Sequence, residues 1–350
     1  MSPVRIGFIG VGSMGQCAHL KHYVTLPDVE VVALAELRPG LRAKVAARYG
    51  VPRTYATHTE LLANEQLDGL VASQLYWRHG GLLPDLYQSG LPVFSEKPLA
   101  ASLEVGERLV AALQASSSWH MVGYHKRSDP ATECAQAEIA RLQATGELGR
   151  LTYVRLLMPA GDWVANGFSD LLTDDGPLPE IASDPPATDL DTATFDQYSR
   201  FVNYYIHQLN LLRFLLGEPY AITYADPSGV LLAGQSRSGV ACAIEMTPYT
   251  TTLDWQESAF ICFEHGTITL ELPAPLAANR PGRVTFFRDP GPGVQPQTVI
   301  PQLPWVSAMR QQAANFVAAI RGERRPPCEA PEALEDLRLA RDYIRLFTGR

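Results

Sequence analysis

Short apolar runs alternate with helix-forming stretches along the first 123 residues. The expected strands are Val4–Ile9, Val29–Ala35, Leu70–Ser73, Val93–Ser95 and Met121–Tyr124. The expected helices run from the first strand to about Leu26, then over Leu41–Tyr49, Arg78–Ser89 and Leu103–Ala115, and Thr57 with Glu60 forms a capping box that opens another short helix. Apolar strands that are each followed by a helix are typical of a parallel sheet covered by helices on both faces. We therefore predict an α/β domain over residues 1–123.

The pattern changes after residue 124, where strands and helices no longer alternate. A helix is expected over Thr132–Thr145, a strand over Leu151–Met158 and a helix over Tyr204–Leu216, with an irregular segment rich in Asp and Pro at residues 159–199. Strands follow at Ala221–Ala225, Val230–Gln235, Val240–Met246, Ser258–Phe263, Thr267–Leu272 and Val284–Phe287, with tight turns at Ser238-Gly239 and His265-Gly266, and helices at Ser307–Arg321 and Pro331–Phe347 close the chain. Strands joined by short turns form antiparallel sheets, so we predict an α+β domain over residues 124–350, with a last helix able to pack back on the first domain.

Composition and charge limit the kinds of molecule that the protein is expected to bind. The chain has 350 residues, 46% of them hydrophobic, and its 29 Lys+Arg against 37 Asp+Glu give a formal net charge of −8. An acidic chain without a basic block is poorly suited to nucleic acid or to an anionic membrane surface, and no apolar run approaches the roughly 18 residues of a membrane span. The five cysteines are scattered and form no Cys-x-x-Cys pair, which indicates neither a disulfide framework nor a metal site. We expect reduced thiols, no bound metal and a cytoplasmic location.

A glycine-rich turn follows the first expected strand. Gly10-Val11-Gly12-Ser13-Met14-Gly15 fits the pattern G-x-G-x-x-G in the strand–turn–helix context that a dinucleotide site requires, although a structural turn without a ligand is the alternative. The glycines of such a turn allow a tight bend, close approach of a pyrophosphate and close packing of helix on strand. Glu36 follows the second strand, where a carboxylate accepts hydrogen bonds from the adenosine ribose and repels a 2′-phosphate. We predict NAD as the cofactor, with NADP left open because Arg38 could pair with that phosphate.

Glu96-Lys97-Pro98 follows the expected strand Val93–Ser95. Ligands bind beyond the carboxyl ends of the strands in an open parallel sheet, so a lysine here would face the nicotinamide end of a dinucleotide. Pro98 restricts Lys97 to extended backbone, which fixes the direction of its side chain. On the tripeptide alone, a surface lysine beside a turn is the simpler interpretation.

Taken together, these motifs resemble the Gfo/Idh/MocA family, the group of glucose–fructose oxidoreductase and inositol 2-dehydrogenase. The resemblance is carried by Gly10–Gly15, Glu36, Ser95-Glu96-Lys97-Pro98-Leu99, Gly123-Tyr124-His125-Lys126-Arg127 and Ile206–Arg213. It implies a Rossmann domain followed by a domain with a large, open, mainly antiparallel sheet. It also implies oxidation of a sugar or polyol hydroxyl, or reduction of the ketone, with a nicotinamide cofactor. Lys97 and His207 match the family's catalytic lysine and histidine.

The resemblance assigns further residues to the cofactor and the substrate. The expected cofactor-binding residues are Gly10, Gly12, Ser13, Met14, Gly15, Glu36, Leu37, Arg38, Ser73, Gln74, Tyr76, His79, Glu96 and Lys97. The expected substrate-binding residues are Lys97, Tyr124, Lys126, Trp163, Asn203, His207 and Asn210. The chain departs from the family pattern at Asn203 and Asn210, which replace aspartates, and at Leu75, which replaces a proline. Proton transfer is thereby left to the two catalytic candidates themselves.

The sequence leaves three functions open. The leading one is an NAD(P)-dependent dehydrogenase or ketoreductase for a neutral sugar, polyol or glycoside. The alternatives are a redox-neutral sugar hydrolase or isomerase that uses bound NAD transiently, and a non-enzymatic dinucleotide-binding sensor. The resemblance further implies a homodimer or homotetramer built through the C-terminal sheet, whose apolar strand positions include Ala241, Ala243, Phe260, Cys262 and Ile268.

Overall fold

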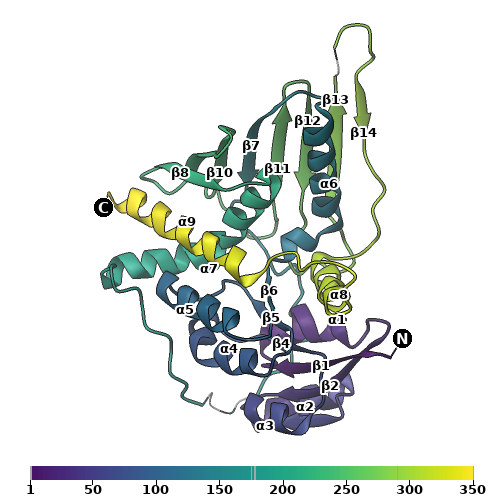
Figure 1. The fold of residues 1–350 in the computed structure, drawn as a ribbon, viewed down its shortest axis with the longest axis vertical. Helices are drawn as coiled ribbons and strands as arrows, with labels where there is room; N and C mark the ends of the chain where they lie inside the picture. The colour runs from purple at the N-terminus through teal and green to yellow at the C-terminus, as the bar shows by residue number, and fades with distance from the viewer. Residues whose placement is uncertain (1, 175, 177–178, 290, 350) are drawn as a thin grey trace. The chain divides into compact units, whose positions relative to one another are not determined.

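The computed structural model describes residues 2–174, 176, 179–289 and 291–349. The chain divides into two compact units (Figure 1). Unit 1 comprises Met1–Tyr124, Asn166–Phe195 and Met309–Leu337, and unit 2 comprises His125–Ala165, Asp196–Ala308 and Arg338–Arg350. The first segment of unit 1 thus ends beside the boundary expected at residue 123. Two later segments also belong to unit 1, and the second contains the start of the last helix.

Unit 1 is built on a parallel sheet, as the apolar runs predict, but it has six strands where five were expected. Its strands are β1 (Val4–Ile9), β2 (Val29–Ala35), β3 (Arg53–Tyr55), β4 (Gly69–Ala72), β5 (Val93–Glu96) and β6 (His120–Gly123). The strand order is β3-β2-β1-β4-β5-β6, and every neighbouring pair is parallel. The direction of winding reverses between β1 and β4, and ligands of such sheets bind in the crevice at this point. The fold therefore puts the glycine-rich turn after β1 at the topological switch point.

Helices cover this sheet. They are α1 (Lys21–Tyr23), α2 (Pro39–Tyr49), α3 (His58–Asn64), α4 (His79–Gln88), α5 (Leu103–Gln114), α8 (Ala308–Ile320) and the first part of α9 (Ala330–Thr348), and α4 and α5 lie side by side (Figure 1). The helix expected to run to Leu26 instead begins as a π-helical segment, Gly15–Leu20, and ends with α1. The predicted capping box is confirmed, because the Glu60 N–H donates to Thr57 Oγ1 at 3.1 Å.

Unit 2 is built on an eight-stranded sheet, which we call sheet B. Its strands are β7 (Leu151–Leu157), β8 (Tyr220–Ala225), β9 (Leu231–Ser236), β10 (Ala241–Glu245), β11 (Ser258–Phe263), β12 (Gly266–Glu271), β13 (Arg283–Arg288) and β14 (Gln297–Val299), in the order β14-β13-β12-β11-β7-β10-β9-β8. All neighbours are antiparallel except β7 and β10, so the sheet is mainly antiparallel, as predicted. The β11–β12 turn lies at Glu264-His265, one residue before the predicted position, since Gly266 already pairs with Phe263.

Helices α6 (Pro130–Thr145) and α7 (Thr192–Leu216) belong mainly to unit 2, as does the part of α9 that begins at Arg338. Helix α6 contacts β12 and β13. Helix α7 begins well before the predicted Tyr204, because Asp191 Oδ1 accepts the Thr194 N–H at 2.9 Å at its N-terminus. The irregular segment is correspondingly shorter than predicted. No helix among the described residues is both long and apolar enough to cross a membrane.

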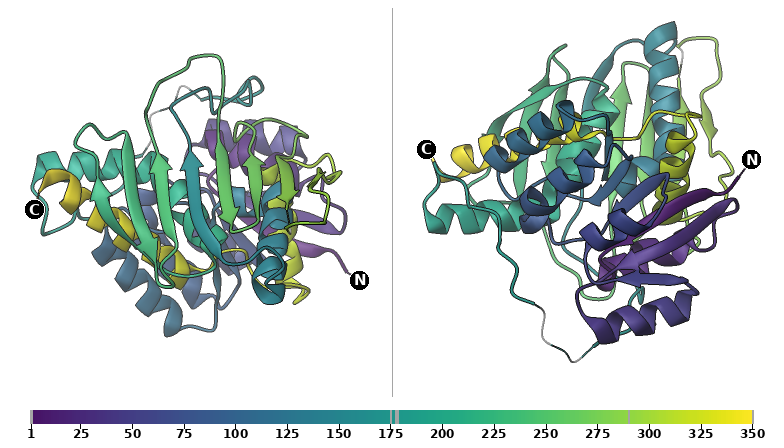
Figure 2. Two further views of the ribbon diagram at one scale, coloured as in Figure 1. Left: turned by 90° about the horizontal axis from the view of Figure 1, so that it is seen from above. Right: turned by 60° about the horizontal axis from the view of Figure 1, so that its bottom comes forward.

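Sheet B has one buried and one open face. Strand register aligns Val154, Ile261 and Ile268 on the buried face. The same register puts Ala243, Arg155 and Phe260 in one row of the open face, and Ala241 and Cys262 in the next. Of the five apolar positions expected on this sheet, Ile268 therefore lies in the core and the other four lie on the open face. Figure 2 (left) shows the strands of this sheet side by side.

Candidate active site

The glycine-rich turn has the geometry that a dinucleotide site needs. Gly10 has a φ of 84°, and a Cβ there would lie 2.6 Å from Ser73 O. A Cβ on Gly15 would lie 2.5 Å from Gly10 O, so both positions require glycine. Gly12 differs, since the atom nearest to a Cβ there would be Arg38 Nη2 at 4.0 Å. The backbone at Gly12 thus borders open space, which fits the close approach of a pyrophosphate.

Glu36 follows β2 and is held by its neighbours. Its Oε2 accepts the Val11 N–H at 3.2 Å, and its Oε1 accepts the Arg38 N–H and Nε–H at 3.1 and 2.9 Å. Burial by itself would raise the pKa of the Glu36 carboxyl, but the hydrogen bonds from Arg38 and Val11 outweigh it and hold the pKa below its usual value. Glu36 is therefore a carboxylate that also neutralises Arg38, and both lie beside the glycine-rich turn.

The chain after β4 forms the other side of the switch point. A Cβ on Gly10 would lie 2.8 Å from Gln74 Nε2, so the Ser73–Gln74 pair packs directly on the glycine-rich turn. Tyr76 is half-buried. His79 is fully buried at the start of α4, and its Nδ1 lies 3.0 Å from Leu99 O. Contact between His79 and the cofactor stays a prediction. The hydrogen bond that the structure shows links the start of α4 to Leu99, directly after Pro98.

Lys97 directly follows β5, and its backbone is anchored. The Lys97 N–H donates to Glu96 Oε2 at 3.1 Å, and Glu96 Oε1 lies 2.6 Å from His19 Nε2 in the π-helical segment. Burial alone would raise the pKa of Glu96, but the His19 and Lys97 contacts outweigh it and lower the pKa. Glu96 thus links the helical segment after the glycine-rich turn to the backbone of Lys97. The sequence pattern assigns Glu96 to the cofactor and does not predict this link. The Lys97–Pro98 peptide is cis.

In unit 2, the polar face of α7 changes from exposed to buried along its length. Asn203 is exposed, His207 is half-buried, and Asn210 is fully buried with its Oδ1 accepting Arg127 Nε–H at 2.6 Å. The His207 ring meets the buried His125 ring edge to face, with centroids 4.8 Å apart. The predicted inward face of the same helix is confirmed, since its leucines are buried: Leu209, Leu212 and Leu216.

The other substrate candidates of the sequence lie in interior positions. Lys126 is buried and forms an ion pair with Glu257 Oε1, which also accepts Gln208 Nε2–H at 2.8 Å. Burial lowers the pKa of Lys126, and the Glu257 charge opposes that shift. Tyr124 is buried and Trp163 half-buried. Their contacts with substrate stay predictions, and the ion pair gives Lys126 a structural role as well.

A small cavity lies next to this ion pair within unit 2. Its lining includes His125, Lys126, Asp129 and Glu257. Asp129 caps α6 by accepting the Ala131 N–H at 2.8 Å, and burial raises its pKa to about 6, although backbone N–H groups oppose the shift. The sequence offered a signal for His125, which sits in the same motif as Lys126, but none for Glu257 or His19. Within the described residues, no cluster of His, Cys, Asp or Glu is arranged to hold a metal ion.

Comparison with known proteins identifies unit 1. Residues 4–124 match the GFO_IDH_MocA family model, described as an oxidoreductase family with an NAD-binding Rossmann fold. This match covers the N-terminal domain alone, so that part of the chain is similar to the family. That domain is therefore an NAD-binding Rossmann domain, in agreement with the open backbone at Gly12 and the carboxylate at Glu36.

Inositol dehydrogenases are among the curated proteins that are similar to this chain. It is 25% identical over 259 residues to scyllo-inositol 2-dehydrogenase (NAD(+)) of Bacillus subtilis, an alignment that covers 69% of this chain and 66% of that protein. It is 32% identical over 134 residues to inositol 2-dehydrogenase 2 of Paenarthrobacter aurescens, covering 37% and 40%. The chain thus spans less than two thirds of the length of these relatives.

Solved structures match the whole chain. Levoglucosan dehydrogenase in complex with NADH and levoglucosan superposes with a TM-score of 0.72 at 17% identity, covering 99% of this chain and 98% of that one. An oxidoreductase domain protein from Kribbella flavida gives 0.75 at 18% identity, covering 100% and 98%. At these identities the likeness establishes a shared fold over both units.

Proposed function

We propose that this protein is an NAD-dependent oxidoreductase that interconverts a hydroxyl of a neutral sugar or polyol and the corresponding ketone. The observation that carries the proposal is Lys97, anchored at the carboxyl end of β5 in an NAD-binding Rossmann domain of an oxidoreductase family. The names of the relatives, inositol and levoglucosan dehydrogenases, support a carbohydrate or polyol substrate. When bound, the nicotinamide supplies a hydride acceptor or donor.

The glycine-rich turn and Glu36 would hold the dinucleotide. A Cβ on Gly12 would meet only Arg38 Nη2, at 4.0 Å, which leaves room for a pyrophosphate, and the Glu36 carboxylate would accept hydrogen bonds from the adenosine ribose hydroxyls. Gln74 lies against the turn from the opposite side of the switch point. These residues bind and orient the cofactor without taking part in proton transfer.

Lys97 would stabilise negative charge on the substrate oxygen, and His207 would transfer the proton of that oxygen. An alcohol that loses a hydride must also lose its hydroxyl proton, so the oxygen needs a base and a nearby positive charge. Lys97 supplies the positive charge, and the imidazole of His207 takes or returns the proton. The neighbouring ring of His125 restricts how the His207 ring can turn.

A stoichiometric assay tests the proposal. The purified chain is incubated with a panel of inositols, sugars and anhydrosugars together with NAD or NADP, and reduced cofactor is followed by its absorbance. We expect NADH to accumulate in equal amount to the oxidised product for at least one polyol. Turnover of a sugar without NADH would favour a redox-neutral enzyme, and NAD binding without any turnover would favour a sensor.

We further propose that the chain forms a homodimer or homotetramer through the open face of sheet B and acts in the cytoplasm. On the open face Ala241 is exposed and Phe260 and Cys262 are half-buried, while Ala243 is buried, so the central strands offer apolar positions that a second copy could cover. None of the five cysteines forms a disulfide in the structure, which suits a reducing compartment.

A further inference from the structure

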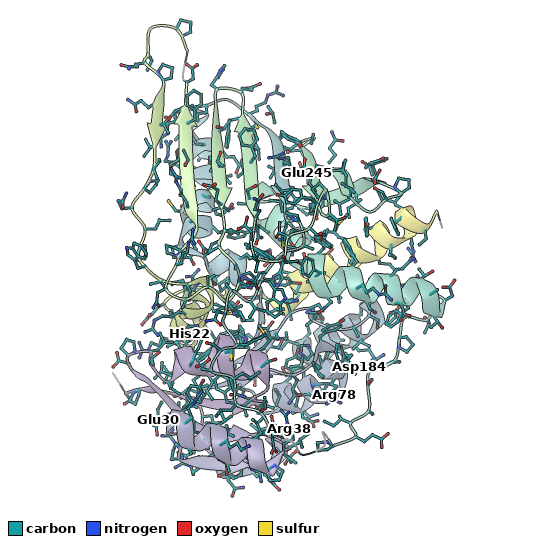
Figure 3. All side chains as sticks on the ribbon, turned by 180° about the vertical axis from the view of Figure 1, so that it is seen from behind. His22, Glu30, Arg38, Arg78, Asp184 and Glu245 are labelled. Atoms are coloured by element: carbon teal, nitrogen blue, oxygen red, sulfur yellow. The ribbon has the colours of Figure 1, made fainter. Side chains whose placement is uncertain are left out.

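Two aspartates of the segment Asn166–Phe195 of unit 1, which we call the acidic segment, contact helices of the Rossmann domain. Asp174 Oδ2 accepts the Leu41 N–H at 3.2 Å, in the first turn of α2. Asp184 Oδ2 accepts the Gly80 N–H at 2.8 Å, in the first turn of α4. Figure 3 labels Asp184 together with Arg38, the residue that precedes α2. The acidic segment therefore places a carboxylate at the N-terminus of each of these two helices.

Glycines make room for both carboxylates. A Cβ on Gly40 would lie 2.6 Å from Asp174 Oδ1, and a Cβ on Gly80 would lie 2.5 Å from Asp184 Oδ1. Both distances are shorter than real Cβ contacts, so neither carboxylate could stay in place if the glycine were replaced. The sequence thus carries a matched aspartate–glycine pair at each helix.

The chain before Asp174 is fixed by further bonds. The Leu172 backbone N–H and C=O both bond the Gln16 side-chain amide at 3.1 Å, and the Lys44 ammonium donates to Thr173 O at 3.0 Å. Leu172 also packs against the hydrophobic core of unit 1. Three consecutive residues therefore bring the Asp174 carboxylate to the first turn of α2.

This turn lies where a Rossmann domain distinguishes NAD from NADP. A 2′-phosphate is held in such domains by an arginine near the end of the second strand, and free N–H groups of a helix N-terminus attract anions. Here Arg38 is already bonded to Glu36 through Nε and Nη2 at 2.9 and 3.2 Å. The N-terminus of α2 is occupied by Asp174. A 2′-phosphate would need the Arg38 guanidinium and the N-terminus of α2. The carboxylates of Glu36 and Asp174 already bind these two groups.

We propose that Asp174 is a specificity-determining residue that keeps the 2′-phosphate of NADP away from the N-terminus of α2. The inference rests on the proposed function, since it takes the adenosine ribose to lie at Glu36. A phosphate monoester carries a charge of about −1.5 to −2 at neutral pH, so Asp174 and Glu36 both repel it. The 2′-hydroxyl of NAD carries no charge and meets no such repulsion. Asp174 therefore adds to the preference for NAD over NADP that Glu36 also provides.

Direct binding of NADH and NADPH to the full chain, followed by nucleotide fluorescence, tests the inference without requiring a substrate. Asp174→Asn keeps an oxygen acceptor for the Leu41 N–H and removes only the charge. We expect it to tighten NADPH binding by about threefold to tenfold and to change NADH binding by less than about twofold. The wild-type preference should shrink at about 0.5 M salt, where charges are screened, and the variant should respond less.

Asp184→Asn is the matched control, because it removes the same charge from the equivalent bond at α4. We expect it to leave the NADH-to-NADPH ratio unchanged. Asp174→Ser removes the charge with a shorter side chain, and agreement between the two Asp174 variants excludes a folding defect.

Three results would overturn the inference. They are an unchanged ratio in both Asp174 variants, an equal change in Asp184→Asn, and a wild-type chain that binds NADPH as tightly as NADH. The last result would leave the oxidoreductase proposal standing. A wild-type chain that binds neither nucleotide would remove the oxidoreductase proposal and this inference together.

Discussion

Lys97 stands out among single residues because its backbone is fixed before any ligand arrives. Glu96 accepts the Lys97 N–H through one oxygen and contacts His19 through the other. His19 lies in the π-helical segment that continues from the glycine-rich turn, and such segments are often found at functional sites. Because the backbone of Lys97 is already held, this residue loses little conformational freedom on binding substrate, which favours its use as a catalytic group.

Replacing Lys97 by methionine should separate catalysis from cofactor binding. Because we propose that the pyrophosphate and ribose lie at Gly12 and Glu36, we expect the dissociation constant for NAD to change by less than about threefold, while kcat falls by about 100-fold or more. Steady-state kinetics on the substrate found by the polyol panel and a nucleotide fluorescence titration give the two values. Lys21→Met, in α1, is the control and should retain wild-type kcat. A Lys97→Met enzyme with near-normal kcat would move the chemistry to other residues.

Among the elements, β6 carries a buried histidine that should make unit 1 sensitive to acid. His120 is fully buried, with Nδ1 2.8 Å from the Tyr87 hydroxyl and Nε2 2.8 Å from Ser95 Oγ. Burial lowers its pKa from 6.5 to about 3, with a smaller contribution from His79. The unfolded chain therefore binds the proton more readily than the folded one, and stability is lost as pH falls from 6.5 toward 3.

The expected slope from His120 is about 1.4 kcal/mol per pH unit over that window. His120→Gln has no titrating group at this position, so its stability should depend less steeply on pH even if it is lower at pH 7. Urea unfolding of both proteins between about pH 7 and pH 4, followed by tryptophan fluorescence, measures the difference. Parallel pH profiles for the two proteins would show that His120 does not titrate on unfolding.

The elements that the sequence predicted are those with a buried face. The Rossmann strands and the inner face of α7 show clear apolar patterns, whereas β3 and β14 were missed. The residues of β14 are all exposed and those of β3 nearly so, and these two edge strands therefore leave no hydrophobic signal, whereas the edge strand β6 is fully buried and was predicted. The same limit applies to the site: motifs predicted Glu36 and Lys97, but the partners His19 and Asp174 come from contacts between residues 77 and 133 positions apart.

At the scale of the whole molecule, the open face of sheet B should control assembly. Phe260 lies in a central strand of this face, in register with Arg155, whose guanidinium is 3.4 Å from Glu245. If copies associate through this face, Phe260→Lys should shift the protein to a monomer, because it would bury an unpaired charge. Light scattering at micromolar concentration reads the mass directly. Gln114→Lys, exposed at the end of α5, should leave the assembly unchanged, and a wild-type monomer would contradict the proposal.

Helix α8 completes the first domain although it is synthesised after most of unit 2. Phe316 of α8 packs its ring 5.8 Å from Phe94 and 5.5 Å from Trp119, and a Cβ on Gly69 would lie 2.6 Å from Ile320 Cδ1. A nascent chain leaves the ribosome from its N-terminus and usually folds its first domain first. Here the strands of the sheet are synthesised first, but the helix that covers its apolar side chains is synthesised only after most of unit 2. Until the ribosome has passed α8, this hydrophobic surface remains open to aggregation and to chaperones, so the rate of translation sets how long that exposure lasts.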